Sequence, residues 1–214
     1  MFTHEVRRYR ITGIEPILGA QPASEAVRTK YLLSKAPQEA LEEESMLATM
    51  GGEDDDMTVF LRDTRHNDRL IWGAHTIESY FKDAFASLRF DLGIHAERSK
   101  VVKYLKVFDN VRTKRKALPL LRDGEEIFDE DCVNERPLRG ATMQGERITL
   151  KASEQLDDPW TLEFDVVLVP NLPTPKSKTV TWEAVEMALE YGAYNGLGQW
   201  RNAGWGRFTW ERVS

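Results

Sequence analysis

The chain has 214 residues, of which 41% are hydrophobic and 30% charged, and its formal net charge at pH 7 is −6. This length and composition predict a single globular domain with one sizeable core. Because no run of about 18 apolar residues occurs, a membrane-spanning helix is excluded. The single cysteine, Cys132, excludes an internal disulfide and a cysteine-rich zinc cluster. The first residues lack the apolar core of a secretory signal, so we expect a cytoplasmic protein with no membrane partner.

Charge is strongly segregated along the chain. Residues 37–56, the acidic insertion, carry eight acidic and no basic side chains. Residues 98–122, the basic arm, carry nine basic side chains and one acidic one, and residues 123–135 carry seven acidic and no basic ones. The overall acidity argues against a generally basic nucleic-acid-binding protein, whereas the basic arm predicts a local anion-binding surface. The alternative is that the acidic stretches are solvated loops and the basic arm is an exposed ribbon.

The N-terminal third combines one clear strand with the acidic insertion. Residues Glu5–Ile14 alternate in a strand pattern, with Tyr9 and Ile11 on one side and polar side chains on the other. Residues Pro37–Met50 contain spaced apolar side chains and predict a short helix. The glycines and carboxylates of Gly51–Asp56 predict a loop.

Two short strands and a helix are predicted next. Residues Thr58–Leu61 and Arg69–Trp72 predict strands joined by a polar turn. Thr76 is suited to cap a helix, because its hydroxyl can accept a hydrogen bond from a backbone amide of the first turn. An apolar stripe at helical spacing then follows, made of Ile77, Phe81, Ala84, Phe85 and Leu88.

The middle of the chain holds the basic arm and a predicted hairpin. Residues Tyr104–Phe108 predict a strand, and residues Arg112–Lys116 predict an exposed turn. Residues Arg147–Ala152 and Trp160–Val169 both alternate between apolar and polar side chains. Because the turn signal Asp157–Pro159 lies between these two segments, they predict a β-hairpin.

The C-terminal third predicts a connector, a helix and a closing strand. Residues Pro170–Lys178 contain three prolines and predict a stiff connector. Thr181 is the predicted N-cap of a helix, and Gly192 is the predicted C-terminal glycine. Residues Gly206–Val213 predict the last strand. The apolar face of the helix is made of Trp182, Val185, Ala188 and Leu189.

The order of these elements predicts the fold class. Strand, helix, strands, helix and strand is the order typical of an α+β, ferredoxin-like (RRM-like) fold. Such a fold has an antiparallel sheet core with two helices, and here it would carry long insertions. An unrelated α+β sandwich is the alternative.

The most informative segment is Gly192–Trp210, which holds five of the fourteen glycines and three of the six tryptophans. Clustered glycines expose backbone amides and allow positive φ, so the chain can approach a phosphate closely. Arginine binds phosphate through paired hydrogen bonds, and tryptophan stacks on nucleobases. Alternatively, the glycines permit a tight return and the tryptophans belong to the core. The predicted contacts are Gly196, Gly198, Trp200, Arg201, Asn202, Gly204 and Arg207.

This ending, with Gly196-Leu-Gly198 and Gly204-Trp-Gly206-Arg207-Phe208, resembles the C-terminal signature of the RAMP superfamily, the ferredoxin-like proteins that bind guide RNA in CRISPR systems. Residues Leu70–Lys82 look like the strand that these proteins run into a helix. Residues Arg136–Leu150, together with the Gly-rich segment, are similar to uncharacterised phage and prophage proteins. The resemblance implies a single RAMP-like domain over residues 1–214, and it adds Lys82 and Arg139 to the predicted contacts.

Nothing in the sequence predicts a cofactor or a metal site. The Gly-rich segment matches neither a dinucleotide-binding fingerprint nor a P-loop. The consecutive carboxylates Glu53–Asp56 cannot converge on one ion. Several RAMP proteins cut RNA without a metal and use a histidine as general acid or base, so the resemblance makes His75 the one weak catalytic candidate.

The leading hypothesis is non-catalytic binding of single-stranded RNA or DNA. In this hypothesis the Gly-rich segment and the basic arm contact phosphates while aromatic side chains stack on bases. One alternative is a metal-independent endoribonuclease that uses His75. The other is a protein-interaction module that forms a homo-oligomer or hetero-complex through its acidic and basic segments. The arm residues assigned to phosphate are Arg112, Lys114, Arg115 and Lys116.

Overall fold

The computed structural model describes residues 5–23, 57–88, 104–142, 145–169 and 180–214, without the side chains of residues 138–149. The chain divides into two compact units. Unit 1 comprises residues 1–17, 61–129 and 157–214, and unit 2 comprises residues 18–60 and 130–156. The predicted helix 37–50, the loop 51–56 and the connector 170–178 lie outside the described residues.

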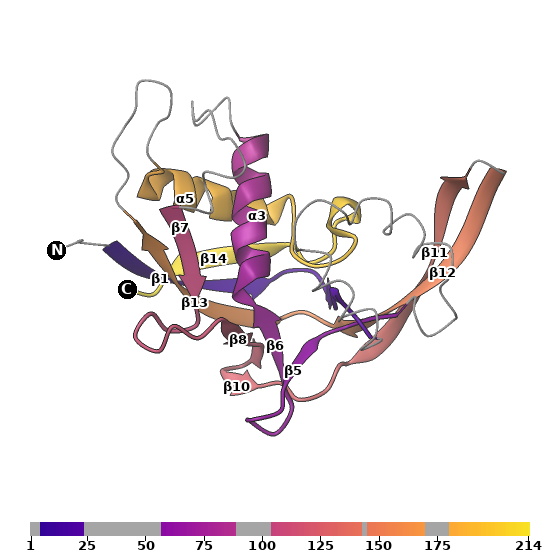
Figure 1. Cartoon of the computed structure of the whole chain (residues 1–214), viewed down its shortest axis with the longest axis horizontal. Helices are drawn as coiled ribbons and strands as arrows, with labels where there is room; N and C mark the ends of the chain where they lie inside the picture. The colour runs from indigo at the N-terminus through magenta and orange to yellow at the C-terminus, as the bar shows by residue number, and fades with distance from the viewer. Residues whose placement is uncertain (1–4, 24–56, 89–103, 143–144, 170–179) are drawn as a thin grey trace, which may run out of the picture. The chain divides into compact units, whose positions relative to one another are not determined.

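The centre of unit 1 is an antiparallel sheet. Its strands are β1 (Glu5–Gly13), β7 (Leu105–Phe108), β13 (Thr161–Leu168) and β14 (Phe208–Arg212). They lie in the order β7-β13-β1-β14, and every neighbouring pair is antiparallel (Figure 1). The short strand β9 (Leu121–Arg122) joins the beginning of β13 and pairs with β10 (Glu125–Glu126).

Two helices, α3 (Ala74–Ser87) and α5 (Trp182–Glu190), cover one face of this sheet (Figure 1). The buried Tyr80 hydroxyl donates to the Ala188 carbonyl at 2.6 Å and ties the helices together. From β1, the Tyr9 hydroxyl donates to Glu186 at 3.1 Å. The sheet side chains that alternate inward therefore build one core with the helices. No helix in the described ranges is long and apolar enough to cross a membrane.

Unit 1 contains a second, smaller sheet of β5 (Leu61–Asp63), β6 (Arg69–Gly73) and β8 (Ala117–Pro119). The predicted strand Arg69–Trp72 is confirmed as β6, but the predicted strand Thr58–Leu61 is not a single strand: its first residues lie in β4 (Met57–Val59), which belongs to another sheet, and the partner of β6 is β5. β8 pairs with β6, so the last part of the basic arm lies beside the strand that leads into α3.

Unit 2 is built on a long hairpin of β11 (Cys132–Thr142) and β12 (Gly145–Leu156). The strand β4 (Met57–Val59) runs parallel to β12, and β3 (Gln21–Pro22) pairs with β4. The chain passes from unit 1 to unit 2 through β2 (Ile17–Leu18).

The α+β class is confirmed, but one predicted strand pairing is wrong. The segments Arg147–Ala152 and Trp160–Val169 lie in β12 and β13, which belong to different sheets: β12 pairs with β11 and β4, whereas β13 pairs with β1. Alternation of apolar and polar residues identifies a strand but not its partner. The partner is chosen by how much side-chain surface each pairing buries.

The helix ends differ in part from their predictions. Thr76 is not an N-cap, because α3 begins at Ala74; its hydroxyl instead donates to the Gly73 carbonyl at 2.6 Å.

Thr181 does cap α5 and accepts a hydrogen bond from the Ala184 amide at 3.3 Å. Gly192 lies inside a 3₁₀ turn, Tyr191–Ala193, and the Phe208 ring occupies the space that a Cβ there would need. Its role is close packing.

Candidate functional site

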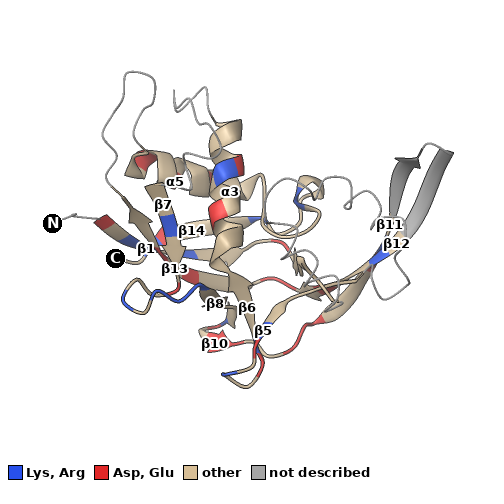
Figure 2. Ribbon diagram, in the orientation of Figure 1, with Lys and Arg blue, Asp and Glu red and all other residues tan. Residues whose placement is uncertain are grey.

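The basic arm contains an exposed loop between β7 and β8, residues 109–116, which we call the arm loop. All four predicted phosphate contacts in it are exposed, and Figure 2 shows basic residues along this loop. They come from a five-residue segment and extend from a short backbone turn. The four cations are Arg112, Lys114, Arg115 and Lys116.

Hydrogen bonds within the arm loop hold its backbone in one conformation. The Arg112 amide donates to the Asn110 side-chain oxygen at 2.9 Å, and the Lys114 amide donates to the Asn110 carbonyl at 2.9 Å. Asn110 and Arg115 form a β-bridge, and the Asp109 amide donates to the Arg115 carbonyl at 2.8 Å. The sequence reasoning missed Asn110, although an Asp-Asn pair before a polar run is a known turn signal.

Three of these cations form no ion pair within the described residues, whereas Lys116 does form one. Lys116 Nζ lies 3.7 Å from a Glu78 carboxylate oxygen and 5.8 Å from the centre of the Phe108 ring. In the described part of the chain, no carboxylate lies within ion-pairing distance of Arg112, Lys114 or Arg115. Among the described residues the arm loop therefore presents three cations that form no ion pair, on a protein that is acidic overall.

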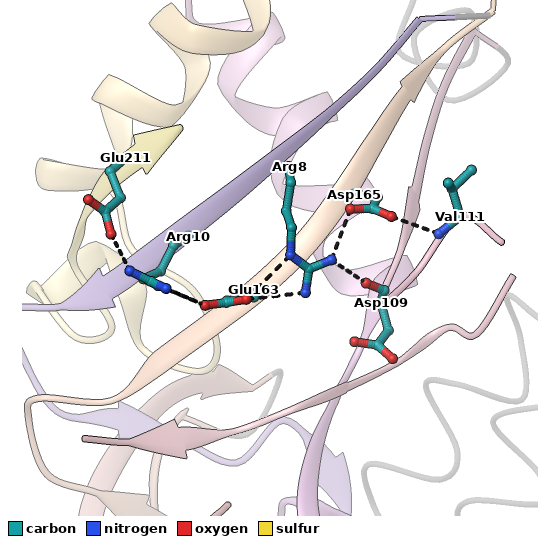
Figure 3. Close-up of polar contacts among 7 residues, drawn as sticks. All are labelled: Arg8, Arg10, Asp109, Val111, Glu163, Asp165 and Glu211. Carbon is teal, nitrogen blue, oxygen red and sulfur yellow. Dashed lines mark hydrogen bonds and ion pairs between the residues drawn. The ribbon is translucent and has the colours of Figure 1, made fainter. Parts of the chain in front are cut away.

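The sheet face turned away from the helices carries a network of ion pairs instead (Figure 3). Arg10 contacts Glu163 at 2.7 Å and Glu211 at 2.6 Å. Arg8 contacts Asp165 at 2.9 Å and Glu163 at 3.2 Å. Two guanidinium groups therefore meet three carboxylates, so this face adds no net positive charge to the neighbouring arm loop.

The network changes the acidity of its carboxyl groups. Burial alone would raise the pKa of Glu163, but hydrogen bonds from Arg10 and Arg8 outweigh burial and hold this pKa below its ordinary value. For Asp109, burial raises the pKa against the opposing effect of Arg8 and Arg115. The two groups therefore affect stability in opposite directions as the pH falls.

We expect the replacement Glu163→Gln to destabilise the protein by about 1–2 kcal/mol at pH 7, because it removes a carboxylate that two arginines share. The lowered pKa of Glu163 means that its stabilisation is present above the unfolded pKa of about 4.3 and is lost as the pH falls through the folded value. Urea denaturation of both proteins at pH 7 and at pH 3 measures this. A stability difference that stays constant at both pH values would contradict the assignment.

Gly196 and Gly206 of the C-terminal segment serve internal packing. The Leu197 amide donates to the Gly206 carbonyl at 2.9 Å, and the Gly206 amide donates to the Pro16 carbonyl at 2.8 Å. A Cβ at Gly196 would overlap the Trp205 carbonyl oxygen. Here the alternative given for this segment, a tight return of the chain, accounts for what is observed.

Both arginines of the segment are ion-paired, which corrects the expected cradle for anions. Arg201 Nη2 donates to an Asp83 carboxylate oxygen at 2.6 Å. Arg207 donates to the Glu15 carboxylate and, at 3.2 Å, to the Gly204 carbonyl. Because each guanidinium already faces a carboxylate, neither presents unmatched charge to a phosphate.

The remaining predicted contacts of the segment are more accessible. Trp200 is 39% exposed, has a left-handed backbone (φ 59°) and stacks on Trp205 with ring centres 6.2 Å apart. Asn202 is exposed in the 3₁₀ turn Arg201–Ala203. Gly198 and Gly204 both have positive φ, at 79° and 97°, which explains glycine at each position.

Three predicted residues lie on other elements. Lys82 is half-buried on α3, and His75 is exposed in the first turn of that helix. Arg139 lies on β11 in unit 2, paired in the backbone with Ile148, and its side chain lies outside the described part. No group of three or more His, Cys, Asp or Glu side chains among the described residues is placed to hold a metal ion.

The structure separates the predicted residues of unit 1 into two groups along α3. The arm loop ends at the start of the helix, where the Ala74 amide donates to the Lys116 carbonyl at 2.8 Å. The C-terminal segment instead contacts Asp83. Given the rise per residue of an α-helix, Asp83 lies about 13 Å further along the helix than Ala74. The first group is near His75 and the second near Lys82.

No protein-family model matches the chain, and no curated protein matches its sequence.

Proposed function

We propose that this protein binds single-stranded nucleic acid, RNA or DNA, and that the arm loop is its phosphate-binding element. The observation that carries the proposal is a set of cations, Arg112, Lys114 and Arg115, that form no ion pair in the described part of the chain and lie on a loop whose backbone is held by its own hydrogen bonds. A preformed loop loses little conformational entropy when it binds. Phosphate groups of a flexible strand are the ligands that such a short basic segment fits best.

The arrangement of unit 1 supports a ferredoxin-like fold. In chain order the central strands are β1, β7, β13 and β14, with α3 after the first and α5 after the third. In the sheet they lie in the order fourth, first, third, second. A β-α-β-β-α-β chain of the ferredoxin-like type has this arrangement, which is also the fold implied by the RAMP resemblance. The segments between β1 and α3 and between β7 and β13 are then insertions.

Trp200 is the second contact that we propose. Its ring is partly exposed and lies on Trp205, so that a base could stack on the outer ring. This contact belongs to the C-terminal group and is separate from the arm loop. Its loss would lower affinity without changing the salt dependence, because stacking releases no counterions.

The test compares two matched double variants. Arg112→Gln with Arg115→Gln removes two unmatched cations, whereas Arg201→Gln with Arg207→Gln removes two ion-paired ones. Binding of fluorescein-labelled oligo(dT) and oligo(U) is followed by anisotropy over a range of salt concentrations. We expect the arm variant to bind about tenfold more weakly and its salt slope to fall by about 1.4, since each lost phosphate contact contributes about 0.7 on a single strand.

The control pair is expected to bind like the parent. Its arginines and their partners are 31–40% exposed, and ion pairs of this kind contribute little to stability, about 0–1 kcal/mol. The proposal is wrong if the parent shows no salt-sensitive binding, or if both double variants lose affinity equally. A preference for oligo(U) over oligo(dT) assigns the ligand to RNA.

Cleavage of RNA is a second candidate, favoured by the position of His75. This exposed histidine lies in the first turn of α3, next to the Ala74 amide that binds the Lys116 carbonyl. A strand bound to the arm loop would then pass close to a group that can transfer protons at neutral pH. Cleavage of labelled RNA in EDTA that His75→Ala abolishes would support it, and uncut RNA with the parent protein would exclude it.

A further inference from the structure

Where the arm loop leaves β7, its backbone is hydrogen-bonded to two side chains of the central sheet, Asp165 and Arg8. Asp165 of β13 uses both carboxylate oxygens: Oδ1 accepts from Arg8 Nη1 at 2.9 Å, and Oδ2 accepts from the Val111 amide at 2.7 Å. Arg8 Nη1 also donates to the Asp109 carbonyl at 2.9 Å. Figure 3 shows these three bonds, two of which hold the backbone of Asp109 and Val111 where the chain leaves β7.

We infer that Asp165 and Arg8 are positioning residues that hold the arm loop in its anion-binding conformation; the inference rests on the proposed function of the loop. Asp165 is 7% exposed and lies on a strand with hydrogen-bonded neighbours on both sides, so its carboxylate is a fixed point. The Asn110–Arg115 bridge transmits this position to the basic side of the loop.

The negative charge of Asp165 and its contact with the arm loop predict opposite changes in oligonucleotide affinity when Asp165 becomes neutral. An affinity measurement therefore decides between them. A carboxylate close to a cationic loop repels an anionic ligand, so Coulomb's law alone predicts tighter binding when Asp165 becomes neutral. If Asp165 instead holds the loop, the replacement Asp165→Asn weakens binding. An asparagine keeps the shape but presents an amide N–H₂ either to the Val111 amide or to the guanidinium of Arg8, both of which are donors.

Glu163 is the matched control. It lies on the same strand and the same sheet face, also pairs with Arg8, and loses one negative charge in Glu163→Gln, but it makes no contact with the arm loop in the described structure. We expect Asp165→Asn to lower the affinity for oligo(dT) and oligo(U) about fivefold, the effect of ordering one or two flexible groups on binding. Glu163→Gln is expected to leave the affinity unchanged or to raise it slightly.

Limited trypsin digestion supplies a measurement that needs no nucleic acid. Trypsin cuts after lysine and arginine, and mass spectrometry identifies cuts after Arg112, Lys114 and Arg115. Local opening limits such cleavage in a folded protein. The urea concentration is chosen for each variant so that both have the same free energy of unfolding. Under these conditions we expect cleavage within the arm loop to be faster in Asp165→Asn than in Glu163→Gln.

A double-mutant cycle separates positioning from a general loss of fold. In the background of Arg112→Gln with Arg115→Gln, Asp165→Asn is expected to have a clearly smaller effect on oligonucleotide affinity than in the parent, because only Lys114 and Lys116 remain to be positioned. An equal loss in both backgrounds would mean that Asp165 acts through the fold alone and would overturn the inference. So would unchanged or tighter binding by Asp165→Asn in the parent background.

A further variant covers the case in which Asp165→Asn does not fold. Arg8→Lys keeps the charge, but one ammonium cannot reach Asp165, Glu163 and the Asp109 carbonyl together as the guanidinium fork does. It is expected to weaken oligonucleotide binding and to expose the loop to trypsin. If the parent binds no oligonucleotide, the proposed function fails, and the trypsin comparison still decides whether Asp165 holds the loop.

Discussion

Replacing Gly206 by alanine is expected to destabilise the protein by about 3 kcal/mol or more. Two costs combine at this position. Gly206 has a φ of 67°, a left-handed conformation that costs an L-residue with a Cβ roughly 1–2 kcal/mol. The Cβ would also overlap the Leu197 carbonyl oxygen, which belongs to the backbone and cannot move aside as a flexible side chain would.

Gly124→Ala is the matched control for this substitution. Gly124 has a similar backbone conformation, with a φ of 85°, but a Cβ there meets no atom within 4 Å. It is expected to lose only the conformational contribution of roughly 1–2 kcal/mol. Urea denaturation followed by tryptophan fluorescence measures both. Equal losses in the two variants would show that the close approach of Leu197 to Gly206 is unimportant for stability.

Replacing Gly13 by alanine is expected to have a comparably large effect, about 3 kcal/mol. A Cβ at Gly13 would overlap the indole ring of Trp160, which is fully buried and whose Nε1 donates to the Glu15 carbonyl at 2.9 Å. The backbones of the two residues are also joined, because the Trp160 carbonyl accepts from the Gly13 amide at 2.7 Å. The glycine and the tryptophan therefore form one packing unit.

A double-mutant cycle measures this unit. Trp160→Ala alone is expected to cost about 3–5 kcal/mol through the cavity that it leaves. Since the alanine methyl at position 13 can enter that cavity, the double variant should lose clearly less than the sum of the single losses. Thr12→Ala, on the opposite side of β1, is the control and should change stability by about 0.5 kcal/mol or less. Additive losses would contradict the packing assignment.

The distribution of matched and unmatched charge decides how this protein can recognise an anion. Arg8 and Arg10 on the sheet, and Arg201 and Arg207 at the C-terminal segment, all face carboxylates. The arm loop differs, because Arg112, Lys114 and Arg115 have no such partner in the described residues. A ligand phosphate would therefore not have to displace a carboxylate at the arm loop, whereas at Arg201 it would compete with Asp83.

Local features of the sequence were sufficient for most of the elements. The alternation in residues 5–14 places Tyr9 and Ile11 on the core side of β1, as observed. The side-chain cap at Thr181 and the exposed turn at Arg112–Lys116 are also confirmed. Each of these depends on neighbours within a few residues, so backbone geometry and side-chain chemistry close in the sequence determine it.

By itself, then, the sequence determined the strands β1, β6, β7, β13 and β14, the helix that begins at Trp182 and the exposed basic turn, but not the long strand β11. Only the tertiary structure decided the partner of each strand and which arginines carry unmatched charge. The physical reason is that ion-pair partners meet through the fold: Arg207 and Glu15 are 192 positions apart, and Arg201 and Asp83 are 118 apart. Composition shows that an arginine is present, but its availability to a ligand depends on the carboxylate that the folded chain brings beside it.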